Sequence, residues 1–451
     1  MKRFQLALLA TFFSATTLLA QPPNIDGNRW TGNTAIAPIQ GNFNQGTPLT
    51  LTWGFMALNT PINDSASSGF ANANNNLPTY LNGIYGSQAV WQPQFQSVFD
   101  RWSSISGLTY QFEANDDGAT FTASTAVGQR GSLGVRADLR IGGKALDGNS
   151  NVLAYNYFPT VGDMVLDTSD NFFTDTSNNS LRLRNVAAHE HGHGLGMQHV
   201  DPSVGKTLME PFVSTAYNGP QFHDILVAQR AYGDALEKSN AGLGNDTAAL
   251  ATSLGAAMGI GQSRTIGTSA GGPKTNMANN NNVVAFTATD FISIDSTTDT
   301  DFYSFTTLTP GRLTVLLEAL GITYDARVQN STTAFNFNAR NRSDLKLALF
   351  DTNGTTILLS VDATTFGGDE TLTFDLLTAG TYFVRVTGFD NPDTATTLDT
   401  QFYGLTVSLA AIPEPTTIAL IGMVGLGGYG YWKRRKRQHE EMLNGRWSRL
   451  S

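Results

Sequence analysis

Two hydrophobic periodicities divide the first half of the chain into predicted helices and strands. One helix is predicted by a stripe with spacing i, i+3, i+4, i+7 and i+10, made of Phe95, Val98, Phe99, Trp102 and Ile105. Two further helices are expected over residues 185–194 and 222–232, the second ending at Gly233. Shorter apolar segments, several alternating with a period of two, predict strands over 48–55, 108–112, 135–141 and 152–158. Residues 57–82 read as a long loop, so a mixed twisted sheet backed by helices is expected.

After Gly233 the pattern changes. Residues 234–282 are rich in Gly, Ala, Asn, Ser and Thr and have little periodicity beyond a short helix near 247–254, so we interpret them as a linker. Short strand patterns separated by turn residues then fill residues 283–410. They are centred on 302–305, 313–317, 345–350, 371–374, 382–386 and 403–407. This pattern predicts an all-β sandwich, so the fold class is α+β followed by β.

The N-terminus has the pattern of an export signal. A short basic segment, Met1-Lys2-Arg3, precedes an apolar run that ends at Ala20. We therefore predict a secretory signal peptide over residues 1–20, with an ordinary N-terminal helix as the alternative. Residues 21–47 are polar and rich in Pro, Gly and Asn, and are expected to form an extended lead-in.

The C-terminus carries a second targeting pattern. Pro413-Glu414-Pro415 precedes an uncharged, Gly-rich stretch over 416–432, and five basic residues follow at 433–437. This stretch can just span a bilayer as a helix, which would leave 438–451 as a cytoplasmic tail. The pattern resembles the PEP-CTERM sorting signal of Gram-negative bacteria. The resemblance implies transient anchoring, removal of the tail by an exosortase-type protease, and delivery to the cell envelope, cell surface or extracellular matrix; a plain stop-transfer anchor is the alternative.

Composition limits the chemistry. Charged residues make up 14% of the chain and the net charge is −9, which argues against nucleic acid as the main partner. The chain contains no cysteine, so disulfides, cysteine-ligated zinc and a thiol nucleophile are excluded.

The densest chemical signal is the run HEHGHGLGMQH over residues 189–199. On a helix, His189 and His193 project from one face and can share a metal ion. Neutral imidazoles suit Zn²⁺, which takes three protein ligands and a water in catalytic sites. His199 reaches the same ion only if the chain turns after His193, and Gly196 with positive φ would end the helix there.

Glu190 lies beside the first predicted ligand and is expected to act on a water at the zinc. As general base it would accept the proton of that water and pass it to the leaving amine. His191 is rotated about 200° from His189 and is interpreted as a packing residue. A purely structural zinc site is the alternative for the three histidines.

Further segments resemble the matrixin family of metzincin peptidases over residues 48–233. Besides the histidine run, the matching parts are 208–211 (LMEP), 147–154, 162–167 with Asp170, and 222–233. The resemblance implies that Met209 forms a hydrophobic floor under the zinc, and that Asp147, Asp167 and Asp170 bind calcium; solvated loop acids are the alternative. Tyr155 and Val165 stand where matrixins have structural-zinc histidines, so no second zinc is predicted. Cysteine-switch latency is excluded by the absence of cysteine.

The segment 152–155 is expected at a sheet edge, where an extended peptide can add as a strand. Val152, Leu153 and Ala154 would bind the substrate backbone, and Pro211 would line the pocket for the first leaving-group side chain. These expectations favour a secreted zinc endopeptidase acting on proteins or peptides. A non-catalytic surface or matrix-binding module is the competing interpretation. Segments 299–305, 347–354 and 379–386 resemble the bacterial pre-peptidase C-terminal domain, and this resemblance spans most of 245–409.

Overall fold

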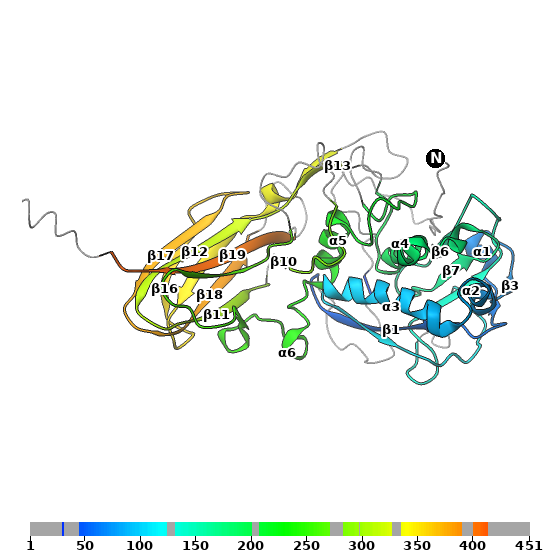
Figure 1. The fold of residues 1–451 in the computed structure, drawn as a ribbon, viewed down its shortest axis with the longest axis horizontal. Coiled ribbons are helices and arrows are strands. Elements are labelled where there is room, and N and C mark those ends of the chain that lie inside the picture. The colour runs from blue at the N-terminus through cyan, green and yellow to red at the C-terminus, as the bar shows by residue number, and fades with distance from the viewer. Residues whose placement is uncertain are drawn as a thin grey trace, which may run out of the picture.

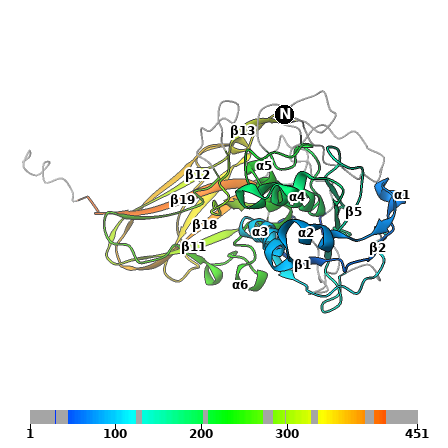
Figure 2. The same cartoon turned by 45° about the vertical axis from the view of Figure 1, so that its right-hand side comes forward.

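The computed structural model describes residues 29–30, 45–123, 131–200, 207–270, 283–296, 298–326, 335–389 and 400–413. They form two domains arranged end to end (Figures 1 and 2). We call residues 45–233 the first domain and residues 245–413 the second domain. The expected signal peptide, most of the lead-in and the expected helix over 416–432 lie outside the described residues. Within the described residues, no helix is both long enough and apolar enough to cross a bilayer.

The first domain is built on a five-stranded sheet. Its strand order is β4 (Leu108–Phe112), β1 (Leu49–Phe55), β5 (Leu139–Lys144), β7 (Met164–Asp167) and β6 (Ala154–Asn156). The first four are parallel, and β6 pairs antiparallel with β7 at one edge. Two expected strands are shorter than predicted. Residues 132–136 form a turn closed by the bond from Ser132 N to Arg136 O, so β5 begins only at Leu139.

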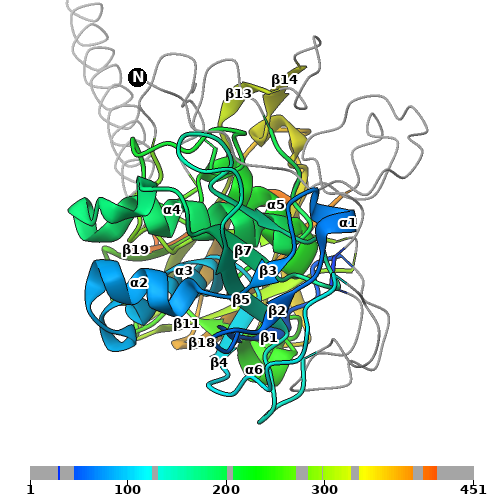
Figure 3. The same ribbon diagram turned by 90° about the vertical axis from the view of Figure 1, so that its right-hand side faces the viewer.

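Helices α2 (Leu77–Tyr85), α3 (Gln88–Ser104) and α4 (Ser177–Gly194) lie together on one side of this sheet (Figure 3). The predicted stripe of α3 is buried, and the ring of Phe99 stacks on that of Trp53 in β1 at 4.5 Å. The expected loop 57–82 is wrong in part. It contains α1 (Ser65–Ser68), the short pair β2 (Pro61–Ile62) and β3 (Ala73–Asn74), and the start of α2. Only Leu77 and Leu81 of α2 are buried, a stripe too short to stand out in the sequence.

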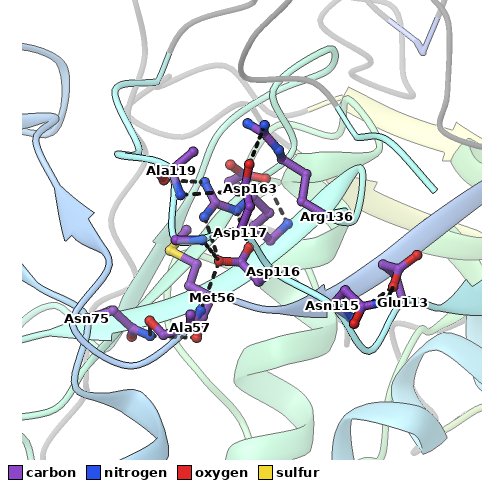
Figure 4. A network of polar contacts seen from close by, with 12 residues as sticks. Met56, Ala57, Asn75, Glu113, Asn115, Asp116, Asp117, Ala119, Arg136 and Asp163 are labelled. Carbon is purple, nitrogen blue, oxygen red and sulfur yellow. Dashed lines mark hydrogen bonds and ion pairs between the residues drawn. The ribbon is translucent and has the colours of Figure 1, made fainter. Parts of the chain in front are cut away.

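Polar networks lie beside a small apolar cluster on the other side of the sheet. Arg140 makes a buried, two-pronged ion pair with Asp116, at 2.7 and 2.9 Å. Figure 4 shows the polar network that contains Asp116. Close by, Asp64 accepts bonds from Lys144 Nζ (2.7 Å) and from the hydroxyls of Tyr155 (2.6 Å) and Tyr157 (2.9 Å). Tyr155 stands where the matrixin resemblance would place a structural-zinc histidine. Its hydroxyl is hydrogen-bonded to the fully buried Asp64–Lys144 ion pair. The expectation of a single zinc stays a prediction.

The second domain is a sandwich of two sheets that are antiparallel except for the parallel pair of β8 with β11, and the strand pattern predicted a sandwich. One contains β10 (Ile292–Ile294), β19 (Gln401–Ala410), β12 (Gly311–Ala319) and β17 (Glu370–Leu376), with β9 (Gln262–Ile266) also paired to β19. The other contains β16 (Ile357–Val361), β15 (Leu345–Phe350), β18 (Gly380–Gly388), β11 (Asp301–Thr307) and β8 (Thr252–Ser253). A hairpin of β13 (Thr323–Ala326) and β14 (Phe335–Asn338) extends from it.

The segment expected as a linker is more structured than its composition indicates. It contains α6 (Ser239–Gly242), the single turn Ala248–Leu250, and the strands β8 and β9, which join both sheets of the sandwich. Every side chain of β9 is exposed or half-buried. These residues pair through their backbones and bury little apolar surface. The sequence therefore has no hydrophobic periodicity that would predict this strand.

Helix α5 (Phe222–Tyr232), predicted with its bounds and its stop at Gly233, lies at the junction of the two domains (Figures 1 and 2). The Phe222 ring packs on Phe402 of β19 at 5.2 Å. Gln229 donates to Phe291 O (3.1 Å) and accepts from Ser293 Oγ (2.8 Å). Several second-domain residues therefore belong to the same hydrophobic core as the first-domain sheet: Phe291, Leu320, Ile322, Tyr324, Phe337, Ala339 and Phe402.

Candidate metal centre

The three histidines of the motif converge in the interior of the first domain. Their ligand nitrogens all lie within 4.8 Å of one another, and each residue is about 1% exposed. His199 Nε2 lies 3.1 Å from His189 Nε2 and 3.1 Å from His193 Nε2. Tetrahedral zinc with Zn–N bonds of 2.0–2.1 Å places its nitrogens about 3.3 Å apart. The spacing therefore fits a single ion held by three imidazoles.

The second nitrogen of two rings fixes their protonation. His189 Nδ1 lies 2.6 Å from Leu208 O, and His193 Nδ1 lies 2.7 Å from Met197 O. Because a carbonyl only accepts, each Nδ1 carries the proton and each Nε2 presents a lone pair to the centre. Burial, together with the neighbouring His199, lowers the pKa of His189 to about 3 and that of His193 well below its usual range. Both rings are therefore neutral, as a metal ligand must be.

The turn expected between His193 and His199 is present. Helix α4 ends at Gly194, and Gly196 has φ +100°, a conformation that L side chains rarely adopt. Helix α4 is longer than the predicted 185–194: it begins at Ser177, with residues 178–180 at positive φ, so the regular helix starts near Leu181. His191 points away from the other histidines, and its Nε2 lies 2.6 Å from the Tyr110 hydroxyl, so it is a packing residue as expected.

Glu190 is fully buried beside the triad. Neither carboxylate oxygen has a hydrogen-bond partner among the described residues, and burial raises the pKa of Glu190 well above its usual range. An unpaired carboxylate in the interior is costly unless a further group binds to it. The orphaned oxygens of Glu190 therefore mark a place where a water or a substrate belongs.

Met209 lies beneath the histidine helix. A Cβ at position 192 would come within 2.4 Å of Met209 Sδ, so the methionine fills the space that Gly192 leaves. Met209 is 1% exposed and belongs to the main core. The role of Met209 as a hydrophobic floor under a zinc ion stays a prediction.

Asp224 of α5 orders the loop that contains Met209, and sequence reasoning missed it. Its carboxylate accepts from Thr207 Oγ1 (2.5 Å), Leu208 N (2.7 Å) and Met209 N (3.2 Å). Leu208 O in turn accepts a hydrogen bond from His189 Nδ1. Asp224 therefore helps to hold the predicted ligand His189 in place through the Leu208 backbone. The sequence feature that could have indicated Asp224 is its place as the third residue of α5 (N3), where an acidic side chain often caps the helix. In this position it also accepts a hydrogen bond from the N-cap Gln221 N at 2.8 Å.

The expected substrate-binding residues lie at the sheet edge. Ala154 begins the edge strand β6, Leu153 and Val152 precede it, and α4 packs against this strand. Pro211 is buried two residues beyond Met209, and Phe212 beside it is 36% exposed. Their role in substrate binding stays a prediction.

The expected calcium ligands do not converge as the histidines do. Asp167 accepts from Leu146 N, Ser169 N and Ser169 Oγ, and Asp170 accepts from Ser150 N and Phe172 N. Asp147 is exposed and accepts from Val152 N at 3.3 Å. These carboxylates hold their own loops together, and calcium binding by them stays a prediction.

A different acidic cluster is close enough to hold a cation. Among the described residues, ligand oxygens of Glu237, Asp299 and Asp301 lie within 4.8 Å of one another at the domain junction. One oxygen of each has no hydrogen-bond partner there, and the same holds for Asn245 Oδ1 and Asp295 Oδ2. Burial and the neighbouring carboxylates raise the pKa of Glu237 to about 10. Hard oxygen donors at a buried, strongly acidic point fit Ca²⁺.

The segment that contains the three histidines matches a known protein family. Residues 85–233 match the family described as Matrixin. The hatching enzyme of Paracentrotus lividus is 32% identical over 162 residues, covering 34% of this chain and 24% of that protein. Matrix metalloproteinase-19 of Homo sapiens is 30% identical over 164 residues (35% and 28%), and metalloendoproteinase 2-MMP of Arabidopsis thaliana is 27% identical over 128 residues (27% and 31%). The chain thus spans less than a third of the length of each relative.

The remaining segments have family matches of their own. Residues 299–388 match the bacterial pre-peptidase C-terminal domain, and residues 411–436 match the PEP-CTERM protein-sorting motif. Among solved structures, the pre-peptidase C-terminal domain of collagenase from Bacillus anthracis aligns with 35% of this chain and 94% of its own length. Its identity of 11% and TM-score of 0.18 are too low to establish a shared fold. Residues 85–233 are thus similar to the matrixin family, and the segments behind them match a pre-peptidase C-terminal domain and a PEP-CTERM sorting motif.

Proposed function

We propose that this chain is an exported, zinc-dependent endopeptidase. His189, His193 and His199 would hold the zinc, which when bound lowers the pKa of a water and polarises the scissile carbonyl. The single observation that carries the proposal is the joint geometry of the site. Two histidines have their Nε2 lone pairs fixed toward a third, and a buried carboxylate without a partner lies beside them.

Each residue of the site then has a defined role. Glu190 accepts a proton from the attacking water and delivers it to the leaving nitrogen. Leu208 O and Met197 O hold the ligand rings, while Asp224 holds the Leu208 backbone. Strand β6 lies at the edge of its sheet, and addition of an extended peptide as a further strand there would favour cleavage within chains rather than at their ends. The PEP-CTERM match supports export and processing by an exosortase-type protease.

Metal removal tests this function directly. We expect the purified protein to contain one zinc per chain and to cleave members of a random peptide library. A chelator should abolish cleavage and added zinc should restore it, because the zinc lowers the pKa of the attacking water and polarises the scissile carbonyl. Zinc content and cleavage products would be measured on the same samples. Zinc-loaded protein that cleaves no peptide would instead favour the non-catalytic binding module.

Calcium is proposed at the junction cluster of Glu237, Asp299 and Asp301 rather than in the loop at Asp147. We expect calcium to raise the thermal midpoint of the zinc-loaded protein, since a ligand at 100 times its dissociation constant stabilises by about 2.7 kcal/mol. Differential scanning calorimetry of two matched variants separates the sites. Asp299→Asn should remove the calcium response, and Asp147→Asn should keep it. The reverse result would return calcium to the loop.

A further inference from the structure

The end of the second domain farthest from the metal centre carries a concentration of exposed aliphatic side chains. Four of the eleven large hydrophobic residues that are exposed in the described part of the chain lie there. They are Leu377 (78% exposed), Leu308 (63%), Ile357 (50%) and Ile260 (47%). We call this end of the sandwich the tip. Soluble domains rarely gather exposed apolar residues in one place unless that surface has a partner.

The sheet registers place these residues together. Strand β11 ends opposite the start of β18, where Thr307 pairs with Gly380, and β12 starts opposite the end of β17, where Gly311 pairs with Leu376. Leu308 and Leu377 therefore occupy neighbouring turns. Backbone bonds bring in the 254–261 loop, because Leu308 N donates to Met258 O (2.9 Å) and Gly261 N donates to Leu409 O (2.7 Å). Ile357 starts β16 opposite Phe350, at the same end.

The tip is almost free of charge. Five segments form it: 254–261, 308–310, 351–356, 377–379 and 410–413. Together they contain one charged side chain, Asp351, in a protein of net charge −9. Just behind the tip, Arg312 and Asp375 pair with each other at 2.7 Å. A partner that binds through electrostatic attraction would require a basic or an acidic surface on the tip. The tip has neither, so it is suited to an uncharged, apolar partner.

The chain itself indicates which partner this is. Strand β19 ends at Ala410 within the tip, at the end of the molecule opposite the first domain (Figure 1), and the PEP-CTERM match begins at residue 411. The uncharged stretch starts at Thr416, and six residues of extended chain span at most about 20 Å. While that stretch is in a bilayer, the tip must lie at the membrane surface.

We propose that the tip is a membrane-contact surface, with Leu308 and Leu377 entering the lipid interface beside the point where the chain enters the bilayer. Apolar side chains at an interface bind in proportion to the apolar area that they bury. Because the tip has no basic residue, its contact should form equally on neutral and anionic lipids. The contact would hold the sandwich upright and keep the metal centre, which lies beyond the sandwich, more than one strand length (about 34 Å for ten residues) from the membrane. This proposal rests on the insertion of the sorting tail into a membrane, which the sequence predicts.

Site-directed labelling tests the contact in the full-length chain. The sequence has no cysteine, so Leu377→Cys and Leu308→Cys each give a single site for an environment-sensitive fluorophore. Leu243→Cys is the matched control, since Leu243 is also a leucine, also 63% exposed, and lies beside α6 near the junction. Each protein would be reconstituted into phosphatidylcholine vesicles, with vesicle flotation reporting insertion of the tail and a lipid-borne quencher reporting contact of the label.

In floated vesicles, we expect blue-shifted emission and several-fold stronger quenching at positions 308 and 377 than at 243. Floated protein whose three labels stay equally exposed to water would overturn the contact and leave the anchor intact. Protein that does not float would overturn both. Labels that become shielded without lipid, in proportion to protein concentration, would assign the tip to a second copy of the chain and overturn the membrane contact. Peptide cleavage on the same samples reports the proposed peptidase function independently.

Discussion

Glu190→Gln should reduce peptide cleavage by roughly 10² to 10⁴-fold while the protein keeps its zinc. The amide has nearly the shape of the carboxylate but cannot accept the proton of the attacking water. The three histidines do not depend on Glu190, whose oxygens have no partner among the described residues. The ligand set should therefore survive the substitution. The measurement is the initial cleavage rate of one library-derived peptide together with the zinc content of each preparation.

Glu318→Gln provides the control, because Glu318 lies on β12 of the second domain and outside the metal centre. Its cleavage rate should equal that of the unmodified protein. Full activity in Glu190→Gln would remove Glu190 from the mechanism. Loss of both activity and zinc would show instead that Glu190 supports the metal site, and would leave the proton transfer to another group.

Phe402→Ala, a change in the second domain, should destabilise the first. Phe402 is 1% exposed and its ring contacts Phe222 of α5 and Phe291. Truncation of a buried phenylalanine costs about 3–5 kcal/mol, because a cavity remains. The cavity would lie against the helix that carries Asp224, so the loop holding Leu208 and Met209 should loosen with it. Denaturant unfolding and amide exchange of α5 would measure the effect.

Phe389→Ala is the matched control, since Phe389 is also in the second domain but 40% exposed, and should change stability little. A chain truncated after Lys238 extends the test, because it lacks the whole second domain. In that chain His223 loses its hydrogen bond to Tyr324, and Gln229 loses its hydrogen bonds to Phe291 O and Ser293 Oγ. We expect that chain to aggregate or to stay unfolded. A stable, fully active first domain on its own would show that the second domain is a removable appendage.

The sequence predicted what short-range geometry controls. The i, i+4 spacing of His189 and His193 places both on one face of any helix, and Gly196 was required wherever His199 turned back. The stripe of α3 and the bounds of α5 followed from periodicity, and the sandwich followed from alternating strands and turn residues. Each of these signals is complete within a few neighbouring residues, so no knowledge of the rest of the chain was needed.

The tertiary structure decided what depends on residues far apart. Asp224 supports the metal centre across a separation of 16 residues from Leu208, and Asp64 pairs with Lys144 across 80. Glu237 comes from the segment between the two domains and meets Asp299 and Asp301 only because the sandwich docks on α5. The tip likewise collects loops that no sequence window contains. The periodicity of hydrophobic and polar residues indicates which face of one helix or strand is buried. These sites depend instead on which helices, strands and loops lie next to one another in the folded chain.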